Sequence, residues 1–154
     1  WAMRSRNDNL ASFIEYLGCA ARELCEGAGV RCRFSEPSTA PPWAMAANVR
    51  QRLLEASREA LTNALQHSGA SEVAIRTEVR DGEFSVLIED DGRGFETGDW
   101  NRGQGGLERM RGGLLEIGGG CTWRSVVGQG TVVRLVLPRA ALTSPPGKEA
   151  AARA

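Results

Sequence analysis

The chain has 154 residues, which is the length of a single domain. Hydrophobic residues make up 42% of it, enough for a buried core, and charged residues make up an ordinary 25%. Acidic and basic residues balance at 19 each, which excludes a broad electrostatic attraction to nucleic acid or to an anionic membrane. The four cysteines form no C-x-x-C pair and the chain has one histidine, so we expect free thiols rather than a zinc site.

Helical and extended patterns alternate in the first half of the chain. Apolar residues recur at helical spacing over residues 10–25, and Gly27 and Gly29 are expected to end that helix. A short strand is expected over residues 30–34, before a loop that contains prolines. The strongest helical pattern covers residues 47–66, where apolar residues fill one face.

The second half changes to a period of two, which is typical of half-buried strands. Asp81-Gly82 predicts a turn between two strands, and Gly128-Gln129-Gly130 predicts a second hairpin. The expected segments are strands at 73–79 and 84–90, a polar glycine-rich loop at 95–106, a helix at 107–117, and strands at 121–127 and 131–137. This order predicts an α+β fold, a two-layer sandwich with a mixed sheet and helices on one face.

Three polar residues form one stripe on the main helix. Glu59, Asn63 and His67 follow one another at intervals of four, so they share a side of the helix away from its apolar face. A carboxylate near an amide oxygen suits hydrated Mg²⁺, which takes few protein ligands and several waters or phosphates. A solvated helix face has the same pattern, and the stripe taken alone favours that interpretation.

An acidic strand end follows in Asp90-Asp91-Gly92-Arg93-Gly94. A carboxylate there can accept a hydrogen bond from an exocyclic amine, and the glycines let a ligand lie close to bare backbone. Aspartate and glycine are also favoured in ordinary turns, which is the alternative explanation.

Two further glycine clusters occur later in the chain. Gly103-Gln104-Gly105-Gly106-Leu107 precedes a predicted helix, so its backbone N–H groups are placed to bind phosphate. A flexible linker would have the same composition. Gly128-Gln129-Gly130-Thr131, taken alone, indicates only a hairpin turn.

The order of the four clusters is more specific than any one of them. The segments REALTNALQH, DDGRGF, GQGGLERM and GQGT resemble the N, G1, G2 and G3 boxes of the GHKL ATPase superfamily, which includes histidine kinases, DNA gyrase B, MutL and heat-shock chaperones. The resemblance covers residues 49–138 and is greatest to sensor kinases of the NarL-type class. The opening segment WAMRSRNDNLASFIEYL resembles the junction between a dimerisation helix and the ATPase domain, which favours a histidine kinase.

The resemblance implies a role for each matching side chain. Asp90 would accept the adenine amino group, and Thr131 would support adenine through a shared water. Asn63 would be the Mg²⁺ ligand, and Glu59 would be the catalytic residue that positions a water or acts as a base. By the resemblance His67 would be a residue of the nucleotide site or a packing residue, and the phosphoacceptor histidine would be on a separate upstream helix.

The resemblance also implies roles for the glycines. Gly92 and Gly94 would let the chain pass close to the nucleotide and hinge a lid. The residues expected to close over the phosphates are Gly103, Gly105, Gly106 and Leu107. Gln66 and Gly113 depart from the family pattern, because lysine and arginine are common at these positions, so the rate of turnover stays open.

The resemblance further implies a division of the chain. Residues 1–9 would end a linker from a missing dimerisation and phosphoacceptor domain, residues 10–138 would form the ATP-binding catalytic domain, and residues 139–154 would be a disordered tail. The expected location is the cytoplasm, whether or not a longer parent protein is anchored in the inner membrane. No contact of this domain with nucleic acid or membrane is expected.

The expected function is transfer of the ATP γ-phosphate to a histidine on a separate dimerisation helix. ATP and Mg²⁺ are the implied cofactors, and a response regulator is the implied partner beyond the kinase itself. Two alternatives remain at this point: a serine kinase of the anti-sigma-factor type, and a degenerate GHKL module that only binds a partner.

Overall fold

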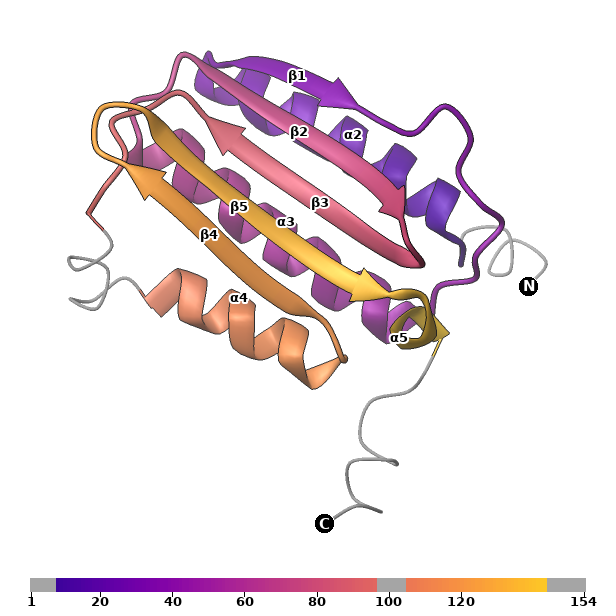
Figure 1. Ribbon diagram of the computed structural model, residues 1–154. Helices are drawn as coiled ribbons and strands as arrows, with labels where there is room; N and C mark the ends of the chain where they lie inside the picture. The colour runs from indigo at the N-terminus through magenta and orange to yellow at the C-terminus, as the bar shows by residue number, and fades with distance from the viewer. Residues whose placement is uncertain (1–7, 97–104, 144–154) are drawn as a thin grey trace.

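The computed structural model, which describes residues 8–96 and 105–143, has two layers. A five-stranded mixed sheet forms one layer, and helices cover one of its faces (Figure 1). The elements in chain order are α2 (Leu10–Ala28), β1 (Arg31–Ser35), α3 (Ala47–His67), β2 (Glu72–Arg80), β3 (Glu83–Asp90), α4 (Gly105–Glu116), β4 (Gly120–Val126), β5 (Gly130–Pro138) and α5 (Arg139–Thr143). The expected α+β sandwich is confirmed.

The strand order of the sheet is β1-β2-β3-β5-β4. β1 is parallel to β2, and the other neighbouring pairs are antiparallel. The register of β3 against β5 places Asp90 opposite Thr131, and the register of β4 against β5 places Ser125 on the other side of Thr131. Two segments that are far apart in the sequence therefore meet at one end of the sheet.

Helix α2 has a well-defined start and end. The Asn9 side chain accepts a hydrogen bond from the Ser12 N–H at 2.8 Å, which satisfies one of the free donors of the first turn. The helix runs through Gly27 and stops at Gly29, whose φ of 68° is the left-handed conformation common at helix C-termini. Only Gly29 therefore ends the helix, and the prediction for Gly27 was wrong.

Helix α3 lies across the middle of the sheet, where it packs against β3, β5 and the other helices (Figure 1). Its buried side chains are Val49, Leu53, Ala56, Ser57, Ala60, Leu61 and Ala64. No side chain caps its start, but the N–H of Ala46 donates to the Leu142 carbonyl of α5 at 2.8 Å. None of the helices in the described ranges has the length and apolar character needed to cross a membrane.

Residues 139–143 form a helix directly after β5, which corrects the expectation that a disordered tail begins at residue 139. Arg139–Thr143 forms α5, and Leu142 is fully buried. The Arg139 N–H donates to the Gly82 carbonyl at 2.9 Å, and its guanidinium lies 5.2 Å from the centre of the Trp43 ring. Burial of Leu142 offsets part of the conformational entropy that is lost when this short segment is ordered. Residues 144–154 lie outside the described residues.

Candidate functional site

A cavity of about 250 Å³ lies where the C-terminal half of α3 faces the ends of β3 and β5. This is close to the lower limit of about 300 Å³ for small-molecule sites. Its lining residues are Ala60, Asn63, Ala64, His67, Ser68, Ile88, Asp90, Arg93, Gly94, Phe95, Leu107, Thr131 and Val133. They come from all four of the sequence clusters or their immediate neighbours, and most of the polar groups are on α3 and at the strand ends.

Asp90 is the only carboxylate among the described residues that line the cavity. It is 6% exposed, and its Oδ1 accepts a hydrogen bond from the Gly92 N–H at 2.9 Å. Burial raises the pKa of this carboxyl above its ordinary value, and backbone hydrogen bonds from Gly92 and Thr131 partly offset the increase. A buried acceptor with remaining lone pairs can bind an amine of a ligand at little further desolvation cost.

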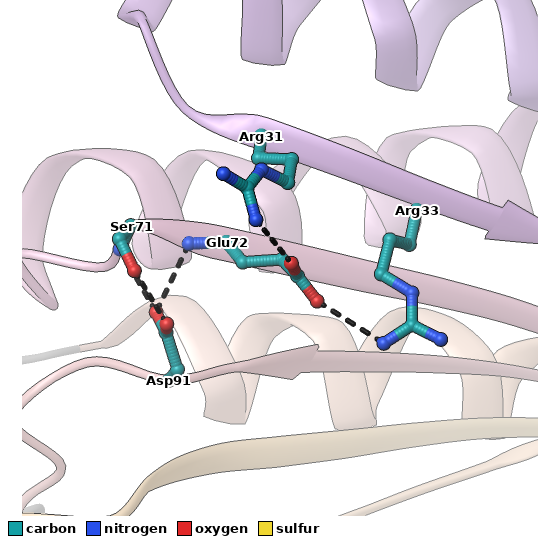
Figure 2. A network of polar contacts seen from close by, with 5 residues as sticks. All are labelled: Arg31, Arg33, Ser71, Glu72 and Asp91. Atoms are coloured by element: carbon teal, nitrogen blue, oxygen red, sulfur yellow. Dashed lines mark hydrogen bonds and ion pairs between the residues drawn. The ribbon is translucent and has the colours of Figure 1, made fainter.

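Asp91, the next residue, faces away from the cavity and organises the start of β2. Its carboxylate accepts hydrogen bonds from the Ser71 N–H at 2.8 Å, the Ser71 hydroxyl at 2.6 Å and the Glu72 N–H at 3.0 Å. Figure 2 shows this contact beside the Glu72 carboxylate, which pairs with Arg31 at 3.6 Å and Arg33 at 3.3 Å. These bonds lower the pKa of Asp91, with the Ser71 hydroxyl as the largest cause.

Three glycines, of which Gly94 lines the cavity, are required because the chain packs closely against itself at these positions. A Cβ on Gly92 would lie 2.4 Å from the Ser68 carbonyl oxygen, and a Cβ on Gly94 would lie 2.1 Å from the Val126 carbonyl oxygen. At Gly130 the same atom would lie 2.0 Å from the Asp90 carbonyl oxygen. Contacts within the protein's own backbone therefore require glycine at these positions. This requirement is separate from the expected close approach of a nucleotide.

A hydrogen-bonded group centred on Ser125 holds the G1 and G3 segments together. The Ser125 hydroxyl lies 2.8 Å from the Thr131 hydroxyl and accepts a bond from the Phe95 N–H at 2.8 Å. Ser125 was missed by the sequence analysis, because only the strand register brings it beside Thr131. The one signal that could have identified Ser125 is its position as a polar residue on the same strand face as Cys121.

The polar stripe of α3 divides between the cavity and a neighbouring surface. Asn63 and His67 line the cavity, but Glu59 does not. The Glu59 carboxylate instead pairs with the Arg109 guanidinium of α4 at 3.3 Å. Glu59 is still close to the site, because a Cβ on Gly106 would lie 2.6 Å from Glu59 Oε1 and 3.5 Å from Asn63 Nδ2.

Of the remaining candidate residues, some lie at the cavity or at the start of α4 and others lie outside the described residues. Leu107 lines the cavity and is 1% exposed, and Gly105 is the first residue of α4. Gly103 lies outside the described residues, as does most of the segment expected to form a lid. Arg93 and Phe95 line the cavity without having been predicted to do so.

Comparison with known proteins places the chain in a family. The family described as histidine kinase-, DNA gyrase B-, and HSP90-like ATPase matches residues 48–141, more than half of the chain. The chain belongs to this ATPase family. The match includes all of the described cavity-lining residues, so the cavity is the candidate ATP site of the family fold.

Individual relatives are sensor kinases. The nitrate/nitrite sensor protein NarQ of Escherichia coli (strain K12) is 35% identical over 96 residues, which cover 62% of this chain and 17% of NarQ. The sensor histidine kinase LiaS of Bacillus subtilis (strain 168) is 30% identical over 95 residues, covering 62% of this chain and 26% of LiaS. The chain thus spans about a quarter or less of the length of these curated relatives.

A solved structure supports the same assignment of the ATPase fold. The histidine kinase domain of the blue-light activated histidine kinase EL346 of Erythrobacter litoralis superposes with a TM-score of 0.69 at 25% identity. The superposition covers 86% of this chain and 65% of that domain.

Proposed function

We propose that this chain is the ATP-binding catalytic domain of a sensor histidine kinase, which transfers the γ-phosphate of ATP to a histidine on a separate dimerisation helix. The observation that carries the proposal is the meeting of Asp90, Thr131 and Asn63 around one cavity. These residues come from three separate boxes of an ATPase family, and the relatives are sensor kinases.

Adenine recognition is assigned to the buried end of the cavity. Asp90 accepts a hydrogen bond from the exocyclic amine, and Thr131 contributes through a shared water. Ile88 and Val133 provide apolar surface for the base. A site that is built to hydrogen-bond an amine discriminates against a base that lacks it, because the buried carboxylate would lose its partner. This arrangement favours adenine over guanine.

The phosphates and Mg²⁺ are assigned to the end of the cavity near Asn63. The residues fit a magnesium ion, because the Asn63 amide lines the cavity and Mg²⁺ keeps most of its coordination for water and phosphate. Within the described ranges no group of three or more His, Cys, Asp or Glu residues is arranged to hold a metal by itself. When bound, the metal would offset charge on the phosphates during transfer.

Glu59 and His67 have subsidiary roles in the proposal. Glu59 positions a water or accepts a proton near the phosphates, from its place beside Gly106. His67 contacts the nucleotide from the end of α3. The reaction also requires the kinase's own dimerisation domain, which carries the phosphoacceptor histidine. A response regulator then accepts the phosphoryl group from that histidine.

Calorimetric titration tests the proposal directly. We expect ATP and ADP to bind in the presence of Mg²⁺ and GTP to bind much more weakly. Chelation of the metal should lower the affinity for ATP more than the affinity for adenosine. Absence of adenine nucleotide binding at millimolar concentration would contradict the proposal. Equal binding of ATP and GTP would contradict the role of Asp90.

A further inference from the structure

An ion pair links α3 to α4 beside the proposed phosphate site. The Arg109 guanidinium donates to Glu59 Oε1 at 3.3 Å. The Arg109 side chain is 76% exposed and the Glu59 side chain is 36% exposed. Such an exposed pair contributes little to stability, so its partners can be exchanged at small cost.

The ion pair is close to the residues that are proposed to hold the phosphates. Gly106 is close to both side chains, since a Cβ at this position would lie 2.6 Å from Glu59 Oε1 and 3.5 Å from Asn63 Nδ2. Asn63 lines the cavity, and Leu107 continues the lining on the α4 side. A phosphate bound near Asn63 is therefore within reach of the long, exposed side chain of Arg109.

Among the described residues that line the cavity, positive charge is scarce. Arg93 is the only lysine or arginine among the described lining residues, and its guanidinium lies near Gly69, beyond the C-terminal end of α3. Arg109 pairs with Glu59, and both line a second pocket between α3 and α4. The other arginine of that pocket, Arg52, pairs with Glu116 at 3.1 Å.

We propose that Arg109 exchanges the Glu59 carboxylate for the terminal phosphate of ATP and so distinguishes ATP from ADP. The inference rests on the proposed function, because it requires the nucleotide in this cavity. Arginine binds phosphate through charge-assisted and often bidentate hydrogen bonds, which are stronger than a single contact with one carboxylate oxygen. The exchange releases Glu59 to act on water or a proton. ADP lacks the γ-phosphate, so the ion pair persists in its complex.

Calorimetric titration of Arg109→Gln with Mg-ATP and Mg-ADP tests the exchange. We expect ATP binding to weaken about tenfold or more, because a hydrogen bond to a charged group is lost. ADP binding should stay as in the wild type. Arg111→Gln is the matched control, since it removes the same charge from the same helix. The Arg111 guanidinium lies 4.4 Å from the centre of the Trp123 ring, so this variant should bind both nucleotides normally.

A second pair of variants tests whether Glu59 competes with the phosphate. In the presence of a chelator, Glu59→Gln should strengthen ATP binding, because the competing carboxylate is removed. The same substitution in the Arg109→Gln background should have no effect. Arg109→Lys, which keeps the charge but not the planar fork, should have an intermediate affinity for ATP.

The outcomes separate the two proposals. If the wild type binds neither nucleotide, the proposed function fails and the exchange fails with it. If the wild type binds both nucleotides, the proposed exchange is contradicted when Arg109→Gln lowers the affinities for ATP and ADP equally. It is also contradicted when the variant lowers neither affinity. An effect of Glu59→Gln that is the same in both backgrounds also overturns it. Thermal unfolding of each variant identifies loss of binding that comes from misfolding, and Arg109→Lys then provides the decisive comparison.

Discussion

Two adjacent carboxylates at the end of β3 have opposite surroundings and opposite pKa shifts. Asp90 is buried, so its pKa is raised, and its charge opposes folding at neutral pH. We expect Asp90→Asn to weaken ATP binding by about 1.5–3 kcal/mol, the usual loss for a hydrogen bond to a charged group. The same variant should be at least as stable as the wild type at pH 7. Titration calorimetry and thermal unfolding check both statements, and unchanged ATP affinity would refute the adenine assignment.

Asp91 should make folding depend on pH in the acid range. Its folded pKa is lower than the ordinary 3.8, so the unfolded state binds more protons as the pH falls below that value. The stability that Asp91 contributes is therefore complete above this range and is lost as the pH falls through its folded pKa. Asp91→Asn should be less stable at pH 7 and show a flatter acid dependence. Denaturant unfolding between acid and neutral pH measures this, and parallel curves for both proteins would contradict it.

The sequence pattern distinguishes Asp90 from Asp91 by strand face but does not identify the partners of Asp91. Alternation in β3 indicates that Asp90 and Ile88 share the inward face, which is a sound basis for Asp90 as the buried acid. The partners of Asp91 come from Ser71 and Glu72, and only the antiparallel register of β2 and β3 brings them together. The link from Ser125 to Thr131 depends in the same way on strand pairing. Contacts of this kind follow from tertiary structure, so local periodicity does not contain them.

At the scale of elements, the β4–β5 hairpin packs closely against the loop that follows β3. The Gly128 N–H donates to the Arg93 carbonyl at 2.7 Å, and Gly94 has a φ of 64° directly against the Val126 carbonyl. Gly94→Ala should therefore cost the usual strain of about 1–2 kcal/mol for a left-handed residue and a backbone clash in addition. Thermal and denaturant unfolding measure the loss of stability.

Gly82→Ala is the matched control for that substitution. Gly82 has a φ of 75° in the β2–β3 turn, and a Cβ there would meet nothing within 4 Å. Its variant should therefore show the conformational strain alone. If Gly94→Ala is no more destabilising than Gly82→Ala, the close approach of the hairpin to the G1 segment is not a constraint on the fold.

Most elements were predictable from periodicity, and the exceptions have physical causes. The stripe on α3 and the alternation in β2 and β3 extend over many residues, so their signals are strong. Helix α5 has only five residues, too few for a repeating apolar pattern, and its order depends on burial of Leu142 and on the hydrogen bond from Ala46. The order of the strands in the sheet was likewise outside the reach of local pattern.

At the scale of the molecule, the four boxes gather at one end of the sandwich. The C-terminal part of α3, the end of β3 and the start of β5 meet there, with α4 beside them (Figure 1). Residues 63 and 131, far apart in the sequence, both line the cavity as a result. The sequence predicted this convergence only through the family resemblance, because spacing along the chain does not determine which strands pair.

The same arrangement limits what the chain can do alone. His67 is the single histidine of the chain, and it lies at the end of α3, which is itself a wall of the cavity. In-line phosphoryl transfer requires the acceptor nitrogen at near-attack distance and on the axis of the leaving oxygen. In the proposed complex His67 contacts the nucleotide from the side of the cavity, so its imidazole is poorly placed to reach that axis. We therefore expect the chain to bind ATP without phosphorylating itself.

Incubation with γ-labelled ATP tests this expectation. The chain alone should acquire no acid-labile label, and a dimerisation segment that carries a phosphoacceptor histidine should become labelled when it is supplied in trans or on the same chain. His67→Asn should leave that phosphotransfer possible, although with weaker nucleotide binding, since the acceptor is elsewhere. Stoichiometric label on His67 would show that the histidine is an acceptor. It would refute both its role as a nucleotide contact and the assignment of the acceptor to a separate helix.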